Sequence, residues 1–335
     1  MRVRAGIVGF RGYSGAELVA ILRKHPQAEP WLLEHRSDAG GRPEPRGDSA
    51  PPRLPCDPEA VAREGIQCVF LATPPEVSIE LAPKMLAAGA KVIDISGAFR
   101  LRTPENYRRW YGAEHSAPEL LERAVYGLPE FYRERLRGAA FVSNPGCYPT
   151  AANLALRPLV RSGQLDLEAG LICDAKSGVS GAGRKPSLKT HFCEAAENFS
   201  AYSLLDHRHV PEVLMNSGLD EAQFSFVAQL LPLDRGILET IYFRSRQFRS
   251  AGDVVALYEQ AYGGEPFVRL YDPGAVPDLR AVQRTNFCDL GVRFDAATGR
   301  GVVVAAIDNL VKGAAGQAIQ NMNLAFGFPE TEGLL

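Results

Sequence analysis

Short apolar runs alternate with segments of helical periodicity in the N-terminal part of the chain. Residues 2–8 form the first apolar run, glycines stand at positions 9, 12 and 15, and residues 16–22 have the apolar spacing of a helix. Three further strand-like runs follow at 31–33, 68–72 and 91–95, and a helix-like segment occupies 77–88. This alternation predicts an α/β fold of the Rossmann type, a doubly wound parallel sheet with helices on both faces.

The pattern changes after Asn144-Pro145-Gly146. Segments rich in β-branched and aromatic residues, such as 223–229 and 239–243, predict a second domain of the α+β type, and residues 312–326 again have helical character. We expect residues 1–146 plus 311–335 to form a dinucleotide-binding domain. Residues 147–310 are expected to form an α+β catalytic and oligomerisation domain. Residues 38–55, which are rich in Gly, Pro, Arg and Asp, are predicted to form an exposed loop.

Composition and charge exclude several classes of protein. The chain has 335 residues, 46% of them hydrophobic, and 37 basic against 39 acidic residues, so it lacks the basic surplus of a nucleic-acid-binding protein. Its apolar runs are far shorter than the ~20 residues that cross a bilayer. No charged leader precedes an apolar stretch at the N-terminus, so we expect a cytoplasmic protein without membrane partners. Six cysteines without C-x-x-C spacing argue against a zinc site and against a disulfide framework.

The first glycine-rich turn is a candidate site for a nucleotide. Gly9, Gly12 and Gly15, with Tyr13 and Ser14 between them, would place backbone N–H groups at the start of a helix, where a pyrophosphate binds. The glycines could instead be simple turn formers, but their place between a first strand and a first helix favours the nucleotide. A register of Gly6, Gly9 and Gly12 is the alternative, and it is disfavoured because Gly6 would lie inside the strand.

The residues after the second predicted strand leave the cofactor open between NAD and NADP. Glu34 stands 34 − 15 = 19 residues after Gly15, which suits the ribose hydroxyl of NAD. Arg36 and Ser37 suit the additional phosphate of NADP. We predict NADP, because this basic pair follows the strand where the phosphate would lie.

Cys147 is the candidate nucleophile. It follows Asn-Pro-Gly, and Pro149 then occupies a position typical of a helix's first turn, so the thiol would lie at a helix N-terminus that stabilises a thiolate. Cys68, Cys173 and Cys288 lie in apolar runs and are predicted to be inert core residues.

A thiol nucleophile needs a base, and His207-Arg208-His209 lies about sixty residues downstream with Glu212 beyond it. Glu212 could orient an imidazole that takes the thiol proton. Either histidine of this segment could serve. The remaining four histidines are predicted to be ordinary surface or core residues, namely His25, His35, His115 and His191.

Seven motifs together resemble the type 1 family of N-acetyl-gamma-glutamyl-phosphate reductases. The resemblance extends in order from about Val3 to Gly327, and the motifs occupy residues 12–18, 94–101, 126–130, 144–150, 177–184, 207–212 and 308–318. It implies reduction of an acyl phosphate to an aldehyde with NADPH, in arginine biosynthesis, through a thioester on the cysteine. It also implies a second domain like that of aspartate-semialdehyde dehydrogenases.

The resemblance assigns roles to individual residues. Cys147 becomes the nucleophile, and His207 with Glu212 becomes the acid/base. Arg100 is expected to bind the substrate phosphate, and Tyr202 and Arg208 the far end of the substrate. Five residues are expected near the pyrophosphate and nicotinamide, namely Ser177, Gly178, Gly181, Gly183 and Asn309. The oxyanion donor is expected to be the Cys147 backbone N–H or the Asn144 side chain.

The neighbouring activities are alternatives of the same reaction type. An amino-adipyl phosphate of lysine biosynthesis or aspartyl phosphate could replace the N-acetylglutamyl substrate. A nucleotide-sensing protein with a dead site would lack the nucleophile or the base, and both are present here. No metal is expected. A broad sheet face in the second domain predicts a homo-oligomer, either a dimer or a tetramer.

Overall fold

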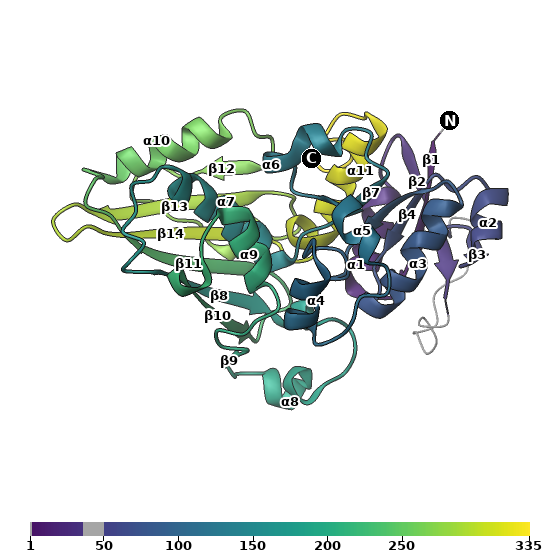
Figure 1. Ribbon diagram of the computed structural model, residues 1–335, viewed down its shortest axis with the longest axis horizontal. Helices are drawn as coiled ribbons and strands as arrows, with labels where there is room; N and C mark the ends of the chain where they lie inside the picture. Colours follow the sequence, from purple (N-terminus) through teal and green to yellow (C-terminus); the bar gives the residue numbers. More distant parts are fainter. Residues whose placement is uncertain (1, 36–49) are drawn as a thin grey trace. The chain divides into compact units, whose positions relative to one another are not determined.

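The computed structural model describes residues 2–35 and 50–335, which fall into two compact units (Figure 1). Unit 1 comprises Met1–Pro145 and Ala314–Leu335, and unit 2 comprises Gly146–Gly313. No helix among the described residues is both long and apolar enough to cross a membrane.

Unit 1 contains a parallel sheet of seven strands in the order β3-β2-β1-β4-β5-β7-β6. The strands are β1 (Val3–Val8), β2 (Ala28–Glu34), β3 (Arg53–Pro55), β4 (Cys68–Leu71), β5 (Lys91–Asp94), β6 (Val125–Tyr126) and β7 (Phe141–Ser143). Every pairing is parallel, and β1 lies between β2 and β4. The chain order therefore reverses at β1, which is the position where doubly wound sheets bind ligands beyond their carboxyl ends.

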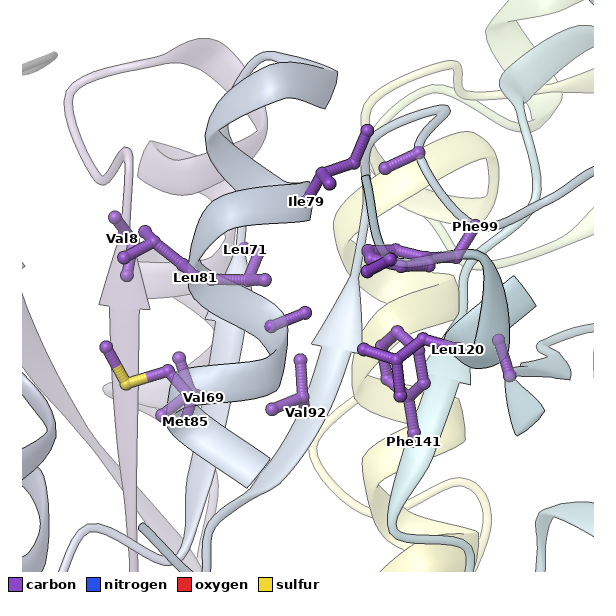
Figure 2. Close-up of a cluster of buried hydrophobic side chains, with 14 of the residues drawn as sticks. Val8, Val69, Leu71, Ile79, Leu81, Met85, Val92, Phe99, Leu120 and Phe141 are labelled. Carbon is purple, nitrogen blue, oxygen red and sulfur yellow. The ribbon is translucent and has the colours of Figure 1, made fainter. Parts of the chain in front are cut away.

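Both faces of this sheet are buried, because neighbouring strand residues point to opposite cores. Val8 belongs to one cluster, together with Leu81 and Met85 of α3 (Pro75–Ala87) (Figure 2). Leu33 belongs to the same cluster. Ile7 belongs to the other cluster, together with Leu18 of α1 (Tyr13–Leu22) and Met322 of α11 (Gly316–Phe326). Burial on both faces explains why these strands appear in the sequence as continuous apolar runs and not as alternating ones.

The helices of unit 1 are α1 (Tyr13–Leu22), α2 (Pro58–Arg63), α3 (Pro75–Ala87), α4 (Pro104–Tyr111), α5 (Pro118–Arg123), α6 (Pro129–Leu136) and α11 (Gly316–Phe326). Five of them begin with proline, which loses nothing at a position whose N–H has no partner inside the helix. The end of the predicted loop at 38–55 differs from expectation, because Arg53–Pro55 pairs with β2 as β3. Residues 38–49 of that loop lie outside the described residues.

Unit 2 contains a mixed sheet of seven strands in the order β12-β13-β14-β11-β8-β10-β9. These are β8 (Leu171–Gly178), β9 (Ser200–Tyr202), β10 (Phe224–Leu231), β11 (Ile237–Arg244), β12 (Val268–Leu270), β13 (Cys288–Asp295) and β14 (Arg300–Ile307). The mixture of strands with helices confirms the predicted α+β second domain.

Helices cover one face of this sheet, while the other face carries exposed apolar residues. The helices of unit 2 are α7 (Cys147–Arg161), α8 (Phe192–Ala195), α9 (Val210–Ser217) and α10 (Ala251–Tyr262), and of these α7 and α10 pack on the sheet. The short turns are η2 (Val179–Ala182), η3 (Leu188–Thr190), η4 (Glu221–Gln223) and η5 (Leu279–Ala281), and the π-helix η6 (Val311–Ala315) precedes α11. Ile237 and Ile241 of β11 are buried beneath helices, whereas Tyr242 and its cross-strand partner Ile172 are exposed.

Candidate active site

The glycine-rich turn of unit 1 has the geometry that a nucleotide phosphate requires. Gly9 has a φ of +79°, and a Cβ there would lie 2.2 Å from the carbonyl oxygen of Ala72. A Cβ at Gly15 would lie 2.2 Å from the oxygen of Gly9. Helix α1 follows with Gly12 as its N-cap, without a side-chain cap or an acidic residue in its first turn. The turn therefore keeps the positive end of the helix open to an anion.

Gly6 takes no part in this turn. It lies inside β1, where a Cβ would meet the side chain of Leu33 at 2.7 Å. The turn accordingly uses the register of Gly9, Gly12 and Gly15, with Tyr13 and Ser14 opening α1.

The end of β2 carries an ion pair that the sequence did not suggest. The Glu34 carboxylate lies 3.2 Å from Arg53 of β3, and both side chains are solvent-accessible. The Arg53 guanidinium also lies 5.6 Å from the ring of Phe10 in the glycine-rich turn, and that of Arg11 lies 5.0 Å from it. Two arginines therefore lie beside the glycine-rich turn, and Arg53 offsets the charge of Glu34. Arg36 and Ser37 lie outside the described residues.

Arg100 and Asn144 of unit 1 are fixed by buried hydrogen bonds. Arg100 donates from Nε to the carbonyl oxygen of Asn144 and from a terminal nitrogen to that of Ile95, each at 2.8 Å. The Asn144 side chain donates to the oxygen of Ala314 and accepts from Asn321. Because its amide group is used within unit 1, we interpret Asn144 as a support for Arg100. A direct contact with substrate stays a prediction.

Cys147 is the first residue of α7, as the sequence predicted. Gly146 is the N-cap, and the first turn contains neither a side-chain cap nor an acidic residue. The thiol is partly exposed, whereas Cys68, Cys173 and Cys288 are buried. Gly313 approaches closely, since a Cβ there would lie 2.8 Å from the Cβ of Cys147. Cys147 is thus an accessible thiol at a helix N-terminus, the setting that favours a thiolate.

Gly146, the residue before the nucleophile, contacts both Glu212 and His209. Its N–H donates to Oε2 of the fully buried Glu212 at 3.0 Å. The His209 ring lies against its other side, where a Cβ would come within 2.7 Å of Nε2. The carboxylate and imidazole of one segment therefore contact the residue that precedes Cys147.

His207 has a different environment, because its ring lies among three aromatic rings. Its ring lies 5.5 Å from that of Tyr148, 5.6 Å from Tyr202 and 5.4 Å from Phe226. Its Nδ1 accepts the backbone N–H of His209 at 3.1 Å, so the neutral ring carries its proton on Nε2. Burial, with a smaller contribution from Arg208, lowers the pKa of His207 to about 4.

Tyr148 and Tyr202 lie side by side next to His207. Their hydroxyl groups are 3.2 Å apart, and Tyr148 also donates to the carbonyl oxygen of Gln229. Burial raises the pKa of both phenols, so both remain neutral donors at pH 7. The structure thus brings the predicted Tyr202 to the residue that follows Cys147. Arg208 is exposed.

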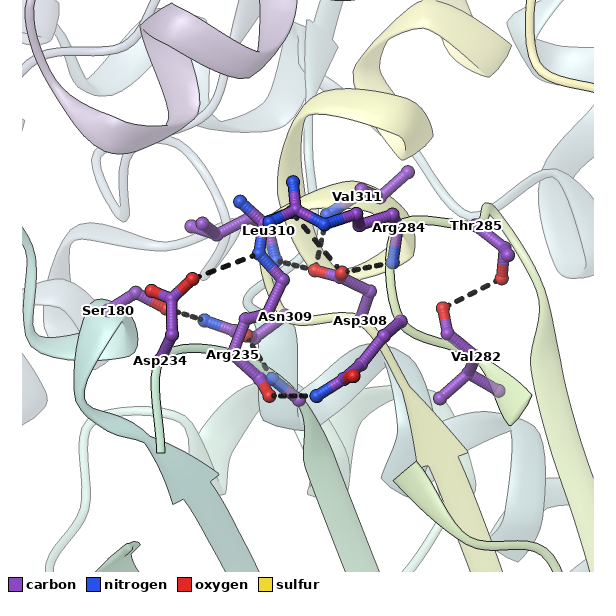
Figure 3. Close-up of polar contacts among 12 residues, drawn as sticks. Ser180, Asp234, Arg235, Val282, Arg284, Thr285, Asp308, Asn309, Leu310 and Val311 are labelled. Carbon is purple, nitrogen blue, oxygen red and sulfur yellow. Dashed lines mark hydrogen bonds and ion pairs between the residues drawn. The ribbon is translucent and has the colours of Figure 1, made fainter. Parts of the chain in front are cut away.

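The predicted nucleotide segment of unit 2 is held together by Asn309. Its side chain donates to Ser180 Oγ at 3.0 Å and accepts the N–H of Gly236 at 2.7 Å (Figure 3). Close packing at Gly178 and Gly181, together with a φ of +82° at Gly183, shapes the same turn. Ser177 donates to the oxygen of Gly178. Since both ends of the Asn309 amide are used within unit 2, we interpret it as a support for this turn.

A buried acid anchors the segment that carries Asn309. Asp308 accepts the N–H groups of Leu310, Val311 and Arg284, and it lies 3.4 Å from the Arg235 guanidinium (Figure 3). These bonds fix the chain just before Gly313, which packs against Cys147.

Comparisons with known proteins agree with this architecture. Residues 4–139 match the family model described as semialdehyde dehydrogenase, NAD binding domain, and residues 147–309 match semialdehyde dehydrogenase, dimerisation domain. The structure of aspartate semialdehyde dehydrogenase II from Vibrio cholerae, complexed with ASA, superposes with a TM-score of 0.72 at 19% identity over 98% of this chain and 99% of that one. The Candida albicans enzyme with NADP gives 0.66 at 18% identity, over 97% and 98%. The fold is that of the semialdehyde dehydrogenases.

Curated relatives place the chain within that class. It is 48% identical to N-acetyl-gamma-glutamyl-phosphate reductase of Symbiobacterium thermophilum, over 100% of this chain and 98% of the relative. Identity to the protein of that name from Geobacillus kaustophilus is 45%, over 99% and 98%. The chain belongs to the family of N-acetyl-gamma-glutamyl-phosphate reductases, which confirms the resemblance of its motifs and its class as an oxidoreductase.

Proposed function

We propose that this chain reduces N-acetyl-gamma-glutamyl phosphate to N-acetylglutamate 5-semialdehyde, with release of phosphate and oxidation of NADPH, in arginine biosynthesis in the cytoplasm. The arrangement around Cys147 carries the proposal. A partly exposed thiol at the start of α7 has the His209 ring and the Glu212 carboxylate on the residue before it. That combination suits attack on an activated acyl group.

The chain's own residues would bind the dinucleotide at the turn after β1. The clashes that a Cβ at Gly9 or Gly15 would create, and the uncapped start of α1, fit a pyrophosphate held by backbone N–H groups. When bound, NADPH supplies a hydride. The turn Ser177–Gly183 is proposed to complete the nucleotide site.

The covalent chemistry runs through Cys147. The thiolate attacks the acyl carbonyl, a C–S bond forms, and the C–O bond to phosphate breaks. The resulting thioester accepts hydride to give a thiohemiacetal, whose C–S bond then breaks to release the aldehyde and restore the thiolate. Backbone N–H groups at the start of α7 would stabilise the oxyanion.

One of the two histidines of the His207–His209 segment must take the proton that the Cys147 thiol loses. The contacts favour His209, because its ring packs against Gly146 while His207 lies among three aromatic rings. We propose His209 as the acid/base with Glu212 stabilising its charged form, and His207 as the alternative.

Other residues are proposed to bind the two ends of the substrate. Arg100 would hold the leaving phosphate, since two backbone carbonyls orient its guanidinium. Tyr202 and Arg208 would hold the end that carries the carboxylate and the acetamido group.

The reverse reaction tests the substrate. With phosphate and NADP saturating, N-acetylglutamate semialdehyde is expected to turn over faster than aspartate semialdehyde or the acetylated adipate homologue. One methylene changes binding by only about 1–3 kcal/mol, so the margin over the homologue is expected to be roughly 10- to 200-fold. Faster turnover of either competitor would refute the assignment and leave the reaction class intact.

Cofactor preference is a second test. Arg36→Ala is expected to raise KM for NADPH roughly 10- to 100-fold, the effect of losing a hydrogen bond to a charged group, and to leave KM for NADH nearly unchanged. Arg137→Ala, which removes an exposed arginine paired with Glu134, is the control. Equal kcat/KM for NADPH and NADH in the unaltered protein would contradict the choice of NADP.

Gly146→Ala tests the contact between His209 and the nucleophile. The new methyl group would lie within 3 Å of three atoms of the His209 ring, so the ring must move. Backbone strain is not at issue, because φ at this residue is −67°. We expect kcat to fall at least about 100-fold, as when general acid-base catalysis is lost. Gly252→Ala in α10, which meets only Ser250 Oγ at 3.3 Å, should retain full activity.

We further propose that the chain acts as a homo-oligomer, a dimer or a tetramer, and that copies associate through unit 2. The uncovered face of its sheet presents Ile172 beside Tyr242, which are 47% and 44% exposed. The family model matched by residues 147–309 is described as a dimerisation domain. Neighbouring apolar residues at such exposure are typical of a contact surface.

A further inference from the structure

Strand β2 of unit 1 ends on an acidic residue that conflicts with the proposed cofactor. Glu34 is the last residue of β2, and its side chain is 49% exposed. In dinucleotide-binding folds a carboxylate at this place accepts the ribose hydroxyls of NAD. The same carboxylate would repel the additional 2′-phosphate of NADP, because like charges at close range raise the free energy of the complex. Selectivity for NADP therefore requires another group that offsets the charge of Glu34.

Arg53 of the edge strand β3 is in position to offset this charge. In the parallel pairing of β2 with β3, Leu32 lies beside Arg53 and Glu34 lies beside Pro55. Since alternate residues of a strand share a face, the side chains of Glu34 and Arg53 project on the same side of the sheet. Arg53 Nη1 donates to Glu34 Oε1 at 3.2 Å. The guanidinium thus neutralises the carboxylate and occupies an oxygen that a ribose hydroxyl would need.

The ion pair lies on the side of the sheet that also carries the glycine-rich turn. Leu32, the neighbour of Arg53 in the pairing, belongs to the same buried cluster as Phe10 of that turn. The Arg53 guanidinium lies 5.6 Å from the centre of the Phe10 ring, and that of Arg11 lies 5.0 Å from it. Two guanidinium groups therefore lie around one ring of the turn that is proposed to hold the pyrophosphate. A guanidinium has five N–H donors, so Arg53 can bind Glu34 and a phosphate at the same time.

We infer that Arg53 determines the preference for NADP, by cancelling the charge of Glu34 and by providing, with Arg11, positive charge for the 2′-phosphate. Without Arg53, the freed carboxylate would accept the ribose hydroxyls of NADH and repel NADPH. The inference rests on the proposed function for the identity of the cofactor. It goes beyond the role proposed for Arg36, because loss of Arg53 is expected to improve the binding of NADH as well as to weaken that of NADPH.

The test is the binding of two cofactor fragments, which needs neither hydride transfer nor substrate. Calorimetric titration compares 2′,5′-ADP, which carries the additional phosphate, with ADP, which carries free ribose hydroxyls, on the unaltered protein and on Arg53→Ala. The dissociation constant of 2′,5′-ADP is expected to rise roughly 10- to 100-fold, the effect of losing a hydrogen bond to a charged group. That of ADP is expected to fall about 2- to 10-fold, because Glu34 becomes available to the hydroxyls. A general loosening of β3 would weaken both fragments, so opposite changes identify the specific role.

Three further variants serve as controls. Arg53→Lys keeps the positive charge and should retain most of the preference for 2′,5′-ADP. In Arg53→Ala/Glu34→Gln the amide carries no charge, so the tighter binding of ADP should disappear and part of the affinity for 2′,5′-ADP should return. Arg63→Ala removes another exposed arginine of unit 1, which pairs with Glu64 at 3.3 Å at the end of α2, and should leave both dissociation constants unchanged.

Equal weakening of both fragments in Arg53→Ala, or an unchanged preference, would overturn the inference and leave the choice of NADP intact. An unaltered protein that binds ADP as tightly as 2′,5′-ADP would contradict the choice of NADP and the inference with it. If Arg53→Ala loses its native circular dichroism, Glu34→Gln at an exposed position takes its place. That variant is expected to bind 2′,5′-ADP about 2- to 5-fold more tightly, the scale of one exposed charge, and unchanged binding would overturn the inference.

Discussion

Replacing Cys147 by serine is expected to lower kcat/KM on the order of 10⁴-fold or more, the scale seen when a covalent nucleophile is removed. Serine keeps the shape of the side chain, but its hydroxyl is a far weaker acid than a thiol and so a far weaker nucleophile in the same position. Nucleotide binding should be unaffected, because the glycine-rich turn belongs to unit 1. Rapid-quench measurements of phosphate release would give the rate of the first step.

The matched control is Cys193→Ser, which alters an exposed cysteine of the same unit. It should retain full turnover. With the unaltered protein and acyl phosphate but no NADPH, mass spectrometry should detect an acyl adduct on the peptide that contains Cys147. Substantial turnover by Cys147→Ser, or an adduct on another residue, would contradict the thioester route.

The fold of unit 1 could be predicted because the composition of its strands reflects their burial. A strand buried on both faces must be apolar throughout, as in Cys68–Leu71, and the intervening helices show their own periodicity. The three residues Arg53–Pro55 gave no such signal, because β3 lies at the edge of the sheet and is largely exposed. The ion pair of its Arg53 with Glu34 could therefore not be predicted.

The C-terminal helix shows how one side chain shifts a boundary. The apolar pattern predicts a single helix over 312–326, but α11 begins at Gly316 after the π-helix Val311–Ala315. Asp308 binds the N–H groups of Leu310 and Val311 and so fixes the entry to this segment. Its partners Arg235 and Arg284 are distant in sequence, so no local pattern could reveal the arrangement.

Part of the candidate site could also be predicted from local sequence signals, and part of it could not. Cys147 could be placed at a helix start because Asn-Pro-Gly and Pro149 are local signals. The choice between His207 and His209 depends on how α9 packs against α7, where the Asn153 side chain and the Gly146 N–H both bind Glu212. The two rings lie 4.8 Å apart, and only tertiary contacts, which no local pattern contains, place the His209 ring against Gly146.

His209→Asn is therefore expected to reduce kcat by about 100- to 10,000-fold, the range for loss of a general acid-base group. Asparagine keeps a similar size and polarity but cannot take up a proton. The matched variant is His207→Asn, which should be milder, because His207 only supports His209, through the hydrogen bond from the His209 backbone N–H to its Nδ1 and through contact of the two rings at 4.8 Å. Single-turnover rates of acylation would separate loss of the base from slower product release.

The pH profile gives a second, independent discriminator between the two histidines. Since the pKa of His207 is lowered to about 4, this imidazole stays neutral above that pH and gains its proton only as the pH falls further. If His207 were the essential base, activity would persist until the pH approached 4, and that acid limb would vanish in His207→Asn. If activity instead falls on acidification well above pH 4, the group that gains the proton is not His207. The same pH dependence in His207→Asn, together with loss of turnover in His209→Asn, would assign the proton to His209. The reverse pattern, with His207→Asn the more damaging change, would return the acid/base role to His207 and leave His209 as the residue that packs against Gly146.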